Sequence, residues 1–245
     1  MSIDHLDVVT TATLRPELLG LTFRSFCNRL LGKIPHCRLI INVDPLPEDD
    51  GRLLESTLQV CHDWFPEVLP RCPDRPSFPD AVRWCWSQVK SEYCFHLEDD
   101  WLLLKSIDPA RVYDYFQESP QLAEVTLNPS RNRPEEPGFA LRPSFVRRDF
   151  LLSALPLFDS ALDPEKQWRR HTSPGGELDI WHFRHYGEIG EGHQVKDMGA
   201  LWRKMRALDK WGAGDVSWTK RQDLAWRRHF YRLKFSLYVT LWKLL

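Results

Sequence analysis

Short apolar runs alternate with amphipathic patterns through the first hundred residues, and this alternation constrains the fold more than any other feature of the sequence. Residues 6–11, 38–43, 68–69 and 93–97 are rich in β-branched, aliphatic and aromatic residues, which is typical of strands. Between them, apolar residues recur every three or four positions, which predicts helices. The order β-α-β-α-β-α-β predicts an α/β fold with an open parallel sheet and right-handed crossovers.

The second half of the chain has less regular patterns. Residues 108–116, 147–155 and 164–170 predict helices, and residues 122–127 predict a strand. Two polar segments, 128–138 and 187–192, predict loops. Residues 224–245 combine basic and aromatic residues in an amphipathic pattern, which predicts a C-terminal helix.

Charge is distributed unevenly along a chain whose formal net charge is only -1. Residues 201–245 contain 11 Lys and Arg against 3 Asp, a net charge of +8, which leaves residues 1–200 at -9. A basic end of this kind favours contact with a polyanion or with an anionic membrane surface. The alternative is that the basic end packs on the acidic body of the same protein.

Cysteine spacing and apolar content exclude several classes of protein. The 6 Cys include no C-x-x-C pair, which excludes zinc-ribbon and thiol redox motifs. The first residues lack the basic start of a signal peptide, and no run of about 18 apolar residues predicts a membrane span. A hydrophobic content of 42% excludes a disordered chain. We therefore expect a folded cytoplasmic protein with free thiols.

Polar side chains follow three of the predicted strands at the point where each strand ends. These are Thr10 with Thr11, Asp44, and the acidic run Glu98-Asp99-Asp100. Ligands bind beyond the carboxyl ends of parallel strands, so these residues are expected to share one crevice. Adjacent carboxylates repel one another and favour a bound cation, and oxygen ligands favour Mg²⁺ or Mn²⁺. The alternative interpretation of the acidic run is a solvated turn.

Four motifs together resemble the glycosyltransferases of the GT-A fold: VVTT, the helix start RPELL, INVD and FHLEDDW. The resemblance is greatest to family-2-like enzymes of phage and bacterial type. It implies a GT-A-like (Rossmann-like), mostly parallel central sheet flanked by helices. The transferase domain would span residues 1–223, with a nucleotide-sugar-binding half (1–105) and an irregular acceptor half (106–223). The helix 224–245 would follow it.

The same resemblance implies roles for the polar residues at the strand ends. Thr10, Thr11 and Arg15 would line the pocket for the nucleotide, and Asp44 would hydrogen-bond its base or ribose. The donor would be a nucleoside-diphosphate sugar, with a UDP-sugar as the first expectation.

The acidic run would hold the metal and the sugar. Asp100 would bind the Mn²⁺ or Mg²⁺ ion that bridges the two phosphates, while Glu98 or Asp99 would face the ribose or the donor sugar. In place of the family's first Asp this sequence has Glu98, whose longer side chain puts direct metal contact in doubt. A late His or Asp often completes such a site, which makes His193 and Asp197 candidates.

Transfer also needs a cation near the departing diphosphate and, if the reaction inverts, a general base. The candidates for the cation are Arg131, Arg133, Arg142, Lys196 and Arg203. The candidates for the base are Glu165, which is preferred, and then Glu177 and Asp179. For each acid the alternative is a helix N-terminal residue that interacts with the helix dipole. For each basic residue the alternative is an ordinary surface position.

Two further residue types have both functional and structural readings. His182 and His185 are three apart, a spacing that can place both on one helical face, but the sequence offers no third ligand for zinc. Aromatic rings stack on sugars and nucleobases, and several of the 11 Trp lie near the predicted site. These are Trp86, Trp101, Trp168, Trp181 and Trp202. Most of them are expected in the core.

The sequence thus predicts metal-assisted transfer of a sugar from a nucleotide donor to a hydroxyl acceptor. The basic-aromatic end and the phage-type resemblance favour a hydroxymethylated base in DNA as acceptor, with a cell-surface glycan or lipid-linked sugar as the alternative. The C-terminal helix would contact DNA, a membrane or its own domain. A nucleotidyltransferase and a non-catalytic nucleotide-binding module are alternatives from other classes. The sequence lacks the Gly-rich basic loop of the nucleotidyltransferases.

Overall fold

A computed structural model describes residues 3–46, 51–127, 139–187, 194–206, 208–211, 217–220 and 225–244. Three of the predicted site residues, Arg131, Arg133 and His193, lie outside these ranges. The predicted loop 128–138 and most of the predicted loop 187–192 also lie outside them.

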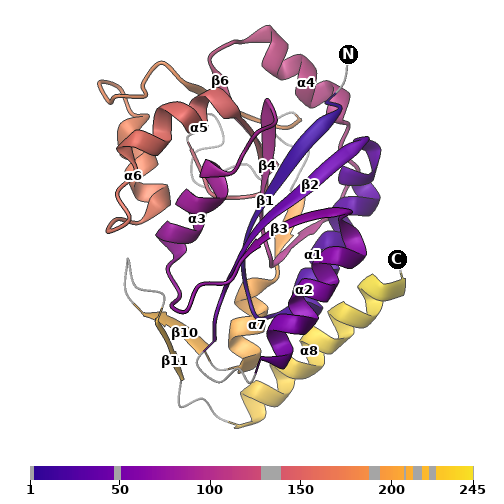
Figure 1. Ribbon diagram of the computed structural model, residues 1–245. Helices are drawn as coiled ribbons and strands as arrows, with labels where there is room; N and C mark the ends of the chain where they lie inside the picture. The colour runs from indigo at the N-terminus through magenta and orange to yellow at the C-terminus, as the bar shows by residue number, and fades with distance from the viewer. Residues whose placement is uncertain are drawn as a thin grey trace.

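A seven-stranded sheet forms the centre of the molecule (Figure 1). In spatial order its strands are β3 (Glu67–Arg71), β2 (His36–Asp44), β1 (His5–Thr13), β4 (Tyr93–Glu98), β7 (Ser144–Arg147), β6 (Leu122–Thr126) and β8 (His182–His185). The first four strands run parallel, β7 is antiparallel to both of its neighbours, and β8 is parallel to β6. The predicted strand–helix order of the first half is confirmed, and the sheet is mostly parallel.

Helices cover both faces of this sheet. One layer contains α1 (Pro16–Arg29), α2 (Arg52–Trp64) and α4 (Pro109–Glu118), and the other contains α3 (Phe78–Ser87), α5 (Arg148–Ala154) and α6 (Pro164–His171). The 3-10 helices η1 (Leu31–Lys33) and η2 (Leu155–Leu157) follow α1 and α5. Each layer packs on its own apolar cluster. Burial of both sheet faces explains why the parallel strands are almost continuously apolar.

Neighbouring residues of a strand point to opposite faces, and this divides the core into two clusters. Val8 of β1 belongs to the cluster beneath α1 and α2, whereas Val9 belongs to the cluster beneath α3, α5 and α6. In the second cluster the rings of Trp86 and Trp168 stack with their centroids 5.8 Å apart. These two Trp are therefore core residues.

Two small sheets and two helices complete the molecule. β5 (Trp101–Leu103) pairs antiparallel with β9 (Val195–Asp197), and β10 (Leu208–Trp211) pairs antiparallel with β11 (Ser217–Lys220). α7 (Gly199–Arg206) follows β9, and α8 (Ala225–Leu244) packs on α1 and α7 through a third apolar cluster. None of the helices within the described ranges combines the length and the apolar character that crossing a bilayer requires.

One local expectation is wrong. His182 and His185 begin and end the strand β8 and do not share a helical face. Residues three apart in a strand point to opposite sides, so the two imidazoles diverge. In the part of the chain that the structure describes, no group of three or more His, Cys, Asp or Glu could hold a metal ion.

Candidate functional site

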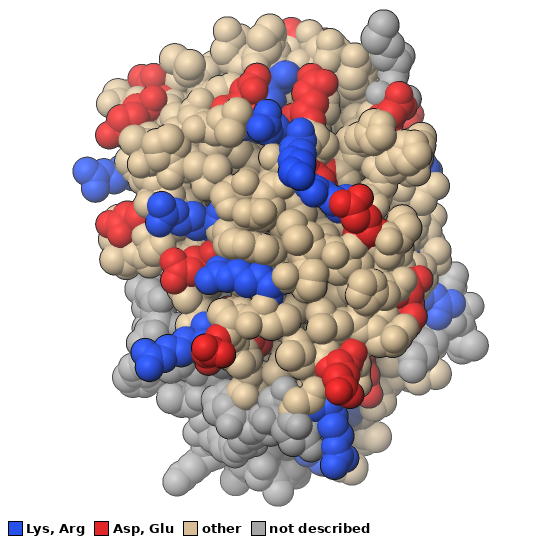
Figure 2. Space-filling model, in the orientation of Figure 1, with Lys and Arg blue, Asp and Glu red and all other residues tan. Residues whose placement is uncertain are grey.

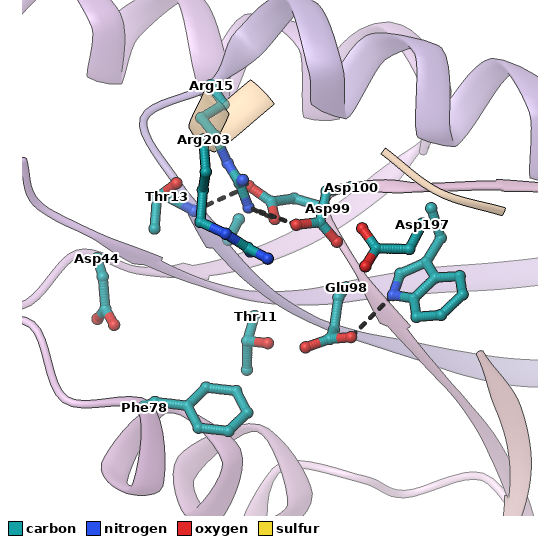
Figure 3. A pocket seen from close by; sticks show the side chains of 12 residues that line it. Thr11, Thr13, Arg15, Asp44, Phe78, Glu98, Asp99, Asp100, Asp197 and Arg203 are labelled. Carbon is teal, nitrogen blue, oxygen red and sulfur yellow. Dashed lines mark hydrogen bonds and ion pairs between the residues drawn. The ribbon is translucent and has the colours of Figure 1, made fainter. Parts of the chain in front are cut away.

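A pocket of about 250 Å³ opens at the carboxyl ends of β1, β2 and β4 (Figure 3). It is lined by Thr11, Ala12, Thr13, Arg15, Asp44, Phe78, Glu98, Asp99, Asp100, Trp101, Asp197 and Arg203. The first ten belong to the first half of the chain, and the last two come from β9 and α7 in the second half. The pocket therefore lies at the sheet edge where the polar strand ends were expected to converge.

Asp99 and Arg15 form a buried ion pair in the wall of the pocket. Nε of Arg15 donates to Oδ2 of Asp99 at 2.9 Å, and Nη2 donates to Oδ1. The backbone N–H of Thr13 also donates to Oδ2, at 3.0 Å, and the Trp202 ring centroid lies 4.9 Å from the guanidinium carbon. Burial acts to lower the pKa of Arg15, but the carboxylates of Asp99 and Asp100 raise it. The ion pair thus links the segment before α1 to the acidic run that follows β4.

Asp100 and Asp197 approach the same backbone position from two different segments. The N–H of Gly199 donates to Oδ1 of Asp197 at 2.7 Å, and a Cβ built on Gly199 would overlap Oδ2 of Asp100. Trp101, the residue after Asp100, is the register partner of Asp197 in the β5–β9 ladder. This ladder brings the two carboxylates together, although they are almost a hundred residues apart in the sequence.

Glu98 lies beside Thr11 on the adjacent strand. The two are register partners in the β1–β4 ladder, and both line the pocket. Nε1 of Trp101 donates to Oε2 of Glu98 at 2.8 Å, which fixes the carboxylate on the pocket side (Figure 3). Trp101 therefore orients Glu98 and also forms part of the wall.

Asp44 ends β2 on the opposite side of Thr11 from Glu98, near Phe78 at the start of α3 (Figure 3). Its Oδ1 accepts a hydrogen bond from Nδ2 of Asn42 at 2.8 Å. Burial raises the pKa of Asp44, and this hydrogen bond acts in the other direction. A buried acceptor beside a flat ring is suited to a polar heterocycle or a ribose hydroxyl.

The pocket carries an excess of negative charge. Its lining contains five carboxylates, those of Asp44, Glu98, Asp99, Asp100 and Asp197, against the guanidiniums of Arg15 and Arg203. An anionic ligand such as a diphosphate would meet net repulsion here unless a cation accompanied it. The two carboxylates at Gly199 supply oxygen ligands for a hard divalent ion, which usually takes its other ligands from phosphate and water. These residues therefore fit Mg²⁺ or Mn²⁺ bound together with a diphosphate.

The structure brings most of the predicted donor-site residues into this pocket, with one informative exception. Thr11 lines it, but Thr10 does not. Strand residues alternate between faces, so the Thr10 hydroxyl points away from Thr11, on the side of the sheet covered by α1. The polar doublet at the strand end contributes one side chain to the pocket.

The three predicted general bases do not line the pocket. Glu165 pairs with Arg169 one helical turn along α6, at 2.6 Å. Glu177 hydrogen-bonds His171 at 2.6 Å, which lowers the pKa of the Glu177 carboxyl, and Asp179 accepts from the backbone of Gly175. Their role as base therefore stays a prediction.

Of the predicted basic residues within the described ranges, Arg203 lines the pocket, whereas Arg142 and Lys196 do not. Trp101 lines the pocket, and the ring of Trp202 packs against the guanidinium of Arg15. Trp181 packs at the edge of the second apolar cluster.

Sequence reasoning did not single out two deeply buried titratable groups of the central sheet. Glu124 on β6 is 1% exposed, and burial raises its pKa to about 8. His96 on β4 is 2% exposed, burial lowers its pKa to about 4, and neither ring nitrogen has a hydrogen-bond partner within the described residues. The only signal in the sequence was one polar residue inside each otherwise apolar strand.

Gly199, Thr13 and Phe78 also belong to the site without having been predicted. Each matters through backbone position or a ring face rather than through a reactive group. Such contributions carry no motif that a single sequence reveals.

Comparison with known proteins supports the fold. No protein-family model matches the chain, and no curated protein does. Among solved structures it is similar to the mannosyltransferase PcManGT from Pyrobaculum calidifontis in complex with GDP-Man and Mn2+, with 12% identity and a TM-score of 0.53. The match covers 82% of this chain and 60% of that one, so the chain spans less than two thirds of the mannosyltransferase. At this identity the likeness shows the fold, a Rossmann-like fold of the glycosyltransferase kind, and confirms the predicted fold class.

Proposed function

We propose that the pocket binds a nucleoside-diphosphate sugar together with Mn²⁺ or Mg²⁺, and that the protein transfers the sugar to a hydroxyl acceptor. The observation that carries this proposal is the meeting of Asp100 and Asp197 at Gly199, beside Arg15 and Arg203, at the carboxyl edge of the parallel strands. The likeness to a mannosyltransferase that binds GDP-Man and Mn2+ supports it.

Different residues of the pocket would contact different parts of the donor. Asp44 would accept hydrogen bonds from the base or ribose, with Phe78 beside it and Thr11 below the ribose. Glu98, held by Trp101, would face the donor sugar.

At the diphosphate end, Asp100 and Asp197 would hold the divalent ion, which supplies positive charge to the departing diphosphate. Arg203 would contact a phosphate oxygen directly. Arg15, whose charge is already satisfied by Asp99 and Asp100, would keep the acidic run in place.

The acceptor predicted from the sequence is a hydroxymethylated base in DNA, and transfer to DNA would weaken steeply as salt rises. Figure 2 shows Lys and Arg interspersed with Asp and Glu over the face that it draws, without one continuous basic surface. The exposed apolar side chains Phe230, Leu233 and Leu237 of α8 favour the alternative, a lipid-linked sugar. Assaying both acceptors at two salt concentrations separates the two classes.

Calorimetric titration with UDP, with and without Mn²⁺, tests the donor site. We expect Asp100→Asn and Asp197→Asn each to weaken Mn²⁺-dependent UDP binding by about tenfold or more, since each removes a charged ligand. Asp74→Asn, at an exposed loop position, is the matched control and should bind like the wild type. Wild-type affinity in both pocket variants would refute the site.

Product analysis tests the reaction type. A glycosyltransferase releases UDP from a UDP-sugar, whereas a nucleotidyltransferase consumes a nucleoside triphosphate and releases pyrophosphate. Pyrophosphate release with no UDP release would favour the nucleotidyltransferase.

A further inference from the structure

Helix α8 has an inner face that is fully used in packing. Phe235 is 4% exposed and lies with Leu18 and Leu21 of α1 and with Met198 and Trp202 of α7 in the third apolar cluster, against which Val239 also packs. Among the α8 side chains that the structure describes, the ones packed in this cluster lie on one side of the helix.

The outer face of the same helix is apolar as well. Phe230, Leu233 and Leu237 are exposed by 56%, 60% and 60%. Their spacing of three and four residues places them in one stripe along the helix. Seven large apolar side chains are strongly exposed within the described residues, and the other four, Leu104, Leu152, Leu162 and Ile180, belong to separate segments. The apolar stripe of α8 is therefore a concentrated feature of this surface.

The exposed Lys and Arg that α8 itself carries beside the stripe are not matched by any acid of this helix. Arg232 and Lys234 are exposed next to Leu233, and His229 is exposed next to Phe230. The whole of α8, AWRRHFYRLKFSLYVTLWKL, contains no Asp or Glu. An apolar stripe flanked by cations complements a surface that combines hydrocarbon with negative charge.

Such a surface is the interface of an anionic lipid bilayer. Apolar side chains enter the boundary between headgroups and acyl chains, while Lys and Arg meet the lipid phosphates. Because α8 is not apolar enough to cross a bilayer, it would lie in the plane of the membrane.

Two other occupants fit less well. Duplex DNA would meet the cations but would leave Phe230, Leu233 and Leu237 against a polar backbone. A second copy in a two-fold contact would place Arg232 and Lys234 opposite like charges, with no carboxylate on the helix to offset them.

We propose that the outer face of α8 docks the protein peripherally on anionic membranes. α8 packs on α7, which begins at Gly199 beside the carboxylates of Asp100 and Asp197 and carries Arg203 of the pocket. Docking would therefore hold the pocket in one orientation relative to the bilayer, as an enzyme needs when its acceptor is embedded in lipid. This last step rests on the proposed function, whereas membrane binding itself does not.

Vesicle co-sedimentation of the full chain tests the proposal. We expect binding to vesicles of phosphatidylcholine containing about one third phosphatidylglycerol, and much weaker binding to phosphatidylcholine alone. Leu233→Gln/Leu237→Gln should lower the affinity for the anionic vesicles by about tenfold or more, because two apolar side chains that would enter the bilayer are lost. Arg232→Gln/Lys234→Gln should lower it by a similar factor and should reduce its dependence on salt.

The matched control is Leu152→Gln/Leu162→Gln, which removes two leucines exposed by 49% and 47% elsewhere on the surface and should bind like the wild type. All variants change exposed side chains, and an unchanged Tm confirms that each one folds. No donor sugar is needed, so a failure here leaves the donor-site proposal standing.

Three outcomes would overturn the proposal. The first is absence of wild-type binding to the anionic vesicles. The second is equal loss of binding in the α8 leucine variant and in the control. The third is that the protein does not bind vesicles and the outer face of α8 has another occupant. That occupant would be a second copy if light scattering shows a dimer that dissociates on Leu233→Gln/Leu237→Gln. It would be DNA if retention of DNA depends on Arg232 and Lys234 but not on the leucines.

Discussion

Individual side chains in this protein act through the backbone positions that hold them. Asp100 and Asp197 are ordinary acids in the sequence, and they become a pair because both approach Gly199, where there is no Cβ to separate them. Burial raises the pKa of Glu124 and lowers the pKa of His96, so both side chains are mainly neutral in the folded state near pH 7.

Gly199→Ala should disrupt the carboxylate pair. The added Cβ overlaps Oδ2 of Asp100, so the carboxylate or the start of α7 must shift, at a cost of about 1–3 kcal/mol of stability. We expect Mn²⁺-dependent UDP binding to weaken by about tenfold or more, measured by calorimetry.

The control is Gly20→Ala in α1, where the added Cβ would lie 3.7 Å from Cγ1 of Val60, an ordinary contact distance. Alanine is the better helix former, so this variant should gain about 0.5–1 kcal/mol without affecting UDP binding. Equal effects of the two substitutions on binding would show that Gly199 has no special role.

Glu124 should make the protein less stable as pH rises. The folded state keeps the proton up to a pKa of about 8, whereas the unfolded chain releases it near the ordinary carboxyl pKa of 4.5. The folded state therefore binds more protons between these values, and stability falls with increasing pH in this window. Glu124→Gln, which does not ionise, should raise the Tm relative to wild type by on the order of 5 °C at about pH 9 and by much less at about pH 5.

Thermal unfolding across this pH range measures the effect, with the exposed acid variant Glu55→Gln as control. A difference between Glu124→Gln and wild type that does not vary with pH would mean that Glu124 is ionised in the folded state throughout.

At the scale of elements, the strands and the helix that line the pocket differ in how many buried side chains hold them in place. β1, β2 and β4 lie inside the sheet with helices on both faces, while α7 and α8 are held by the smaller third cluster. The side of the pocket that carries Arg203 is therefore attached through fewer buried side chains than the strand side. Local opening is expected where such contacts are few.

Phe235→Ala should release α8 without unfolding the sheet. Removing a buried Phe leaves a cavity that costs about 3–5 kcal/mol, which is a large share of what a single small cluster contributes. We expect hydrogen exchange to accelerate through residues 225–244 while amides of β1 and β4 keep their protection.

Ser236→Ala, at the exposed neighbouring position, is the control and should leave exchange unchanged. Loss of protection in β1 and β4 to the same extent as in α8 would show that the molecule unfolds as one unit.

At the scale of the whole molecule, the distribution of charge is expected to couple binding of the proposed nucleotide to binding of the proposed metal ion. The pocket has more carboxylates than guanidiniums, so the nucleotide and the cation should each bind better in the presence of the other. Ligands that bind only the folded state raise its stability.

UDP and Mn²⁺ together should therefore raise the Tm by on the order of 5 °C at saturating concentrations, whereas UDP with a chelator should raise it little. Differential scanning calorimetry measures the shift, and inorganic sulfate at equal ionic strength is the control for non-specific anion effects. The same increase with UDP and chelator would contradict the proposed metal dependence of the site.

Local patterns were enough to predict the first half of the fold. The strands around Val8, Ile40 and Phe95 are buried on both faces, so they are almost continuously apolar, and the helices between them show a clear period. The ends of these strands must share one edge, which is why Thr11, Asp44, Glu98 and the acids after it could be assigned to one crevice. The expectation of a shared crevice did not settle which individual side chains enter it, because Thr10 and Thr11 point to opposite faces of the sheet and only Thr11 lines the pocket.

The second half was predicted less well because its short strands depend on distant partners. β7, β8 and β9 span 4, 4 and 3 residues and contain His, Lys, Arg or Asp, so their extended conformation comes from pairing across the sheet and not from local propensity.

The amino-acid sequence alone determined the class of the fold, the edge of the sheet where the pocket lies, and the acidic character of that edge, because each depends on residues close together in the chain. Only the tertiary structure decided that the carboxylates of Asp197 and Asp100 lie together at Gly199 and that Asp99 forms an ion pair with Arg15. It also decided that α8 exposes a second apolar face to solvent. These depend on contacts between residues separated by tens to more than two hundred positions, whose geometry follows from packing of the whole chain.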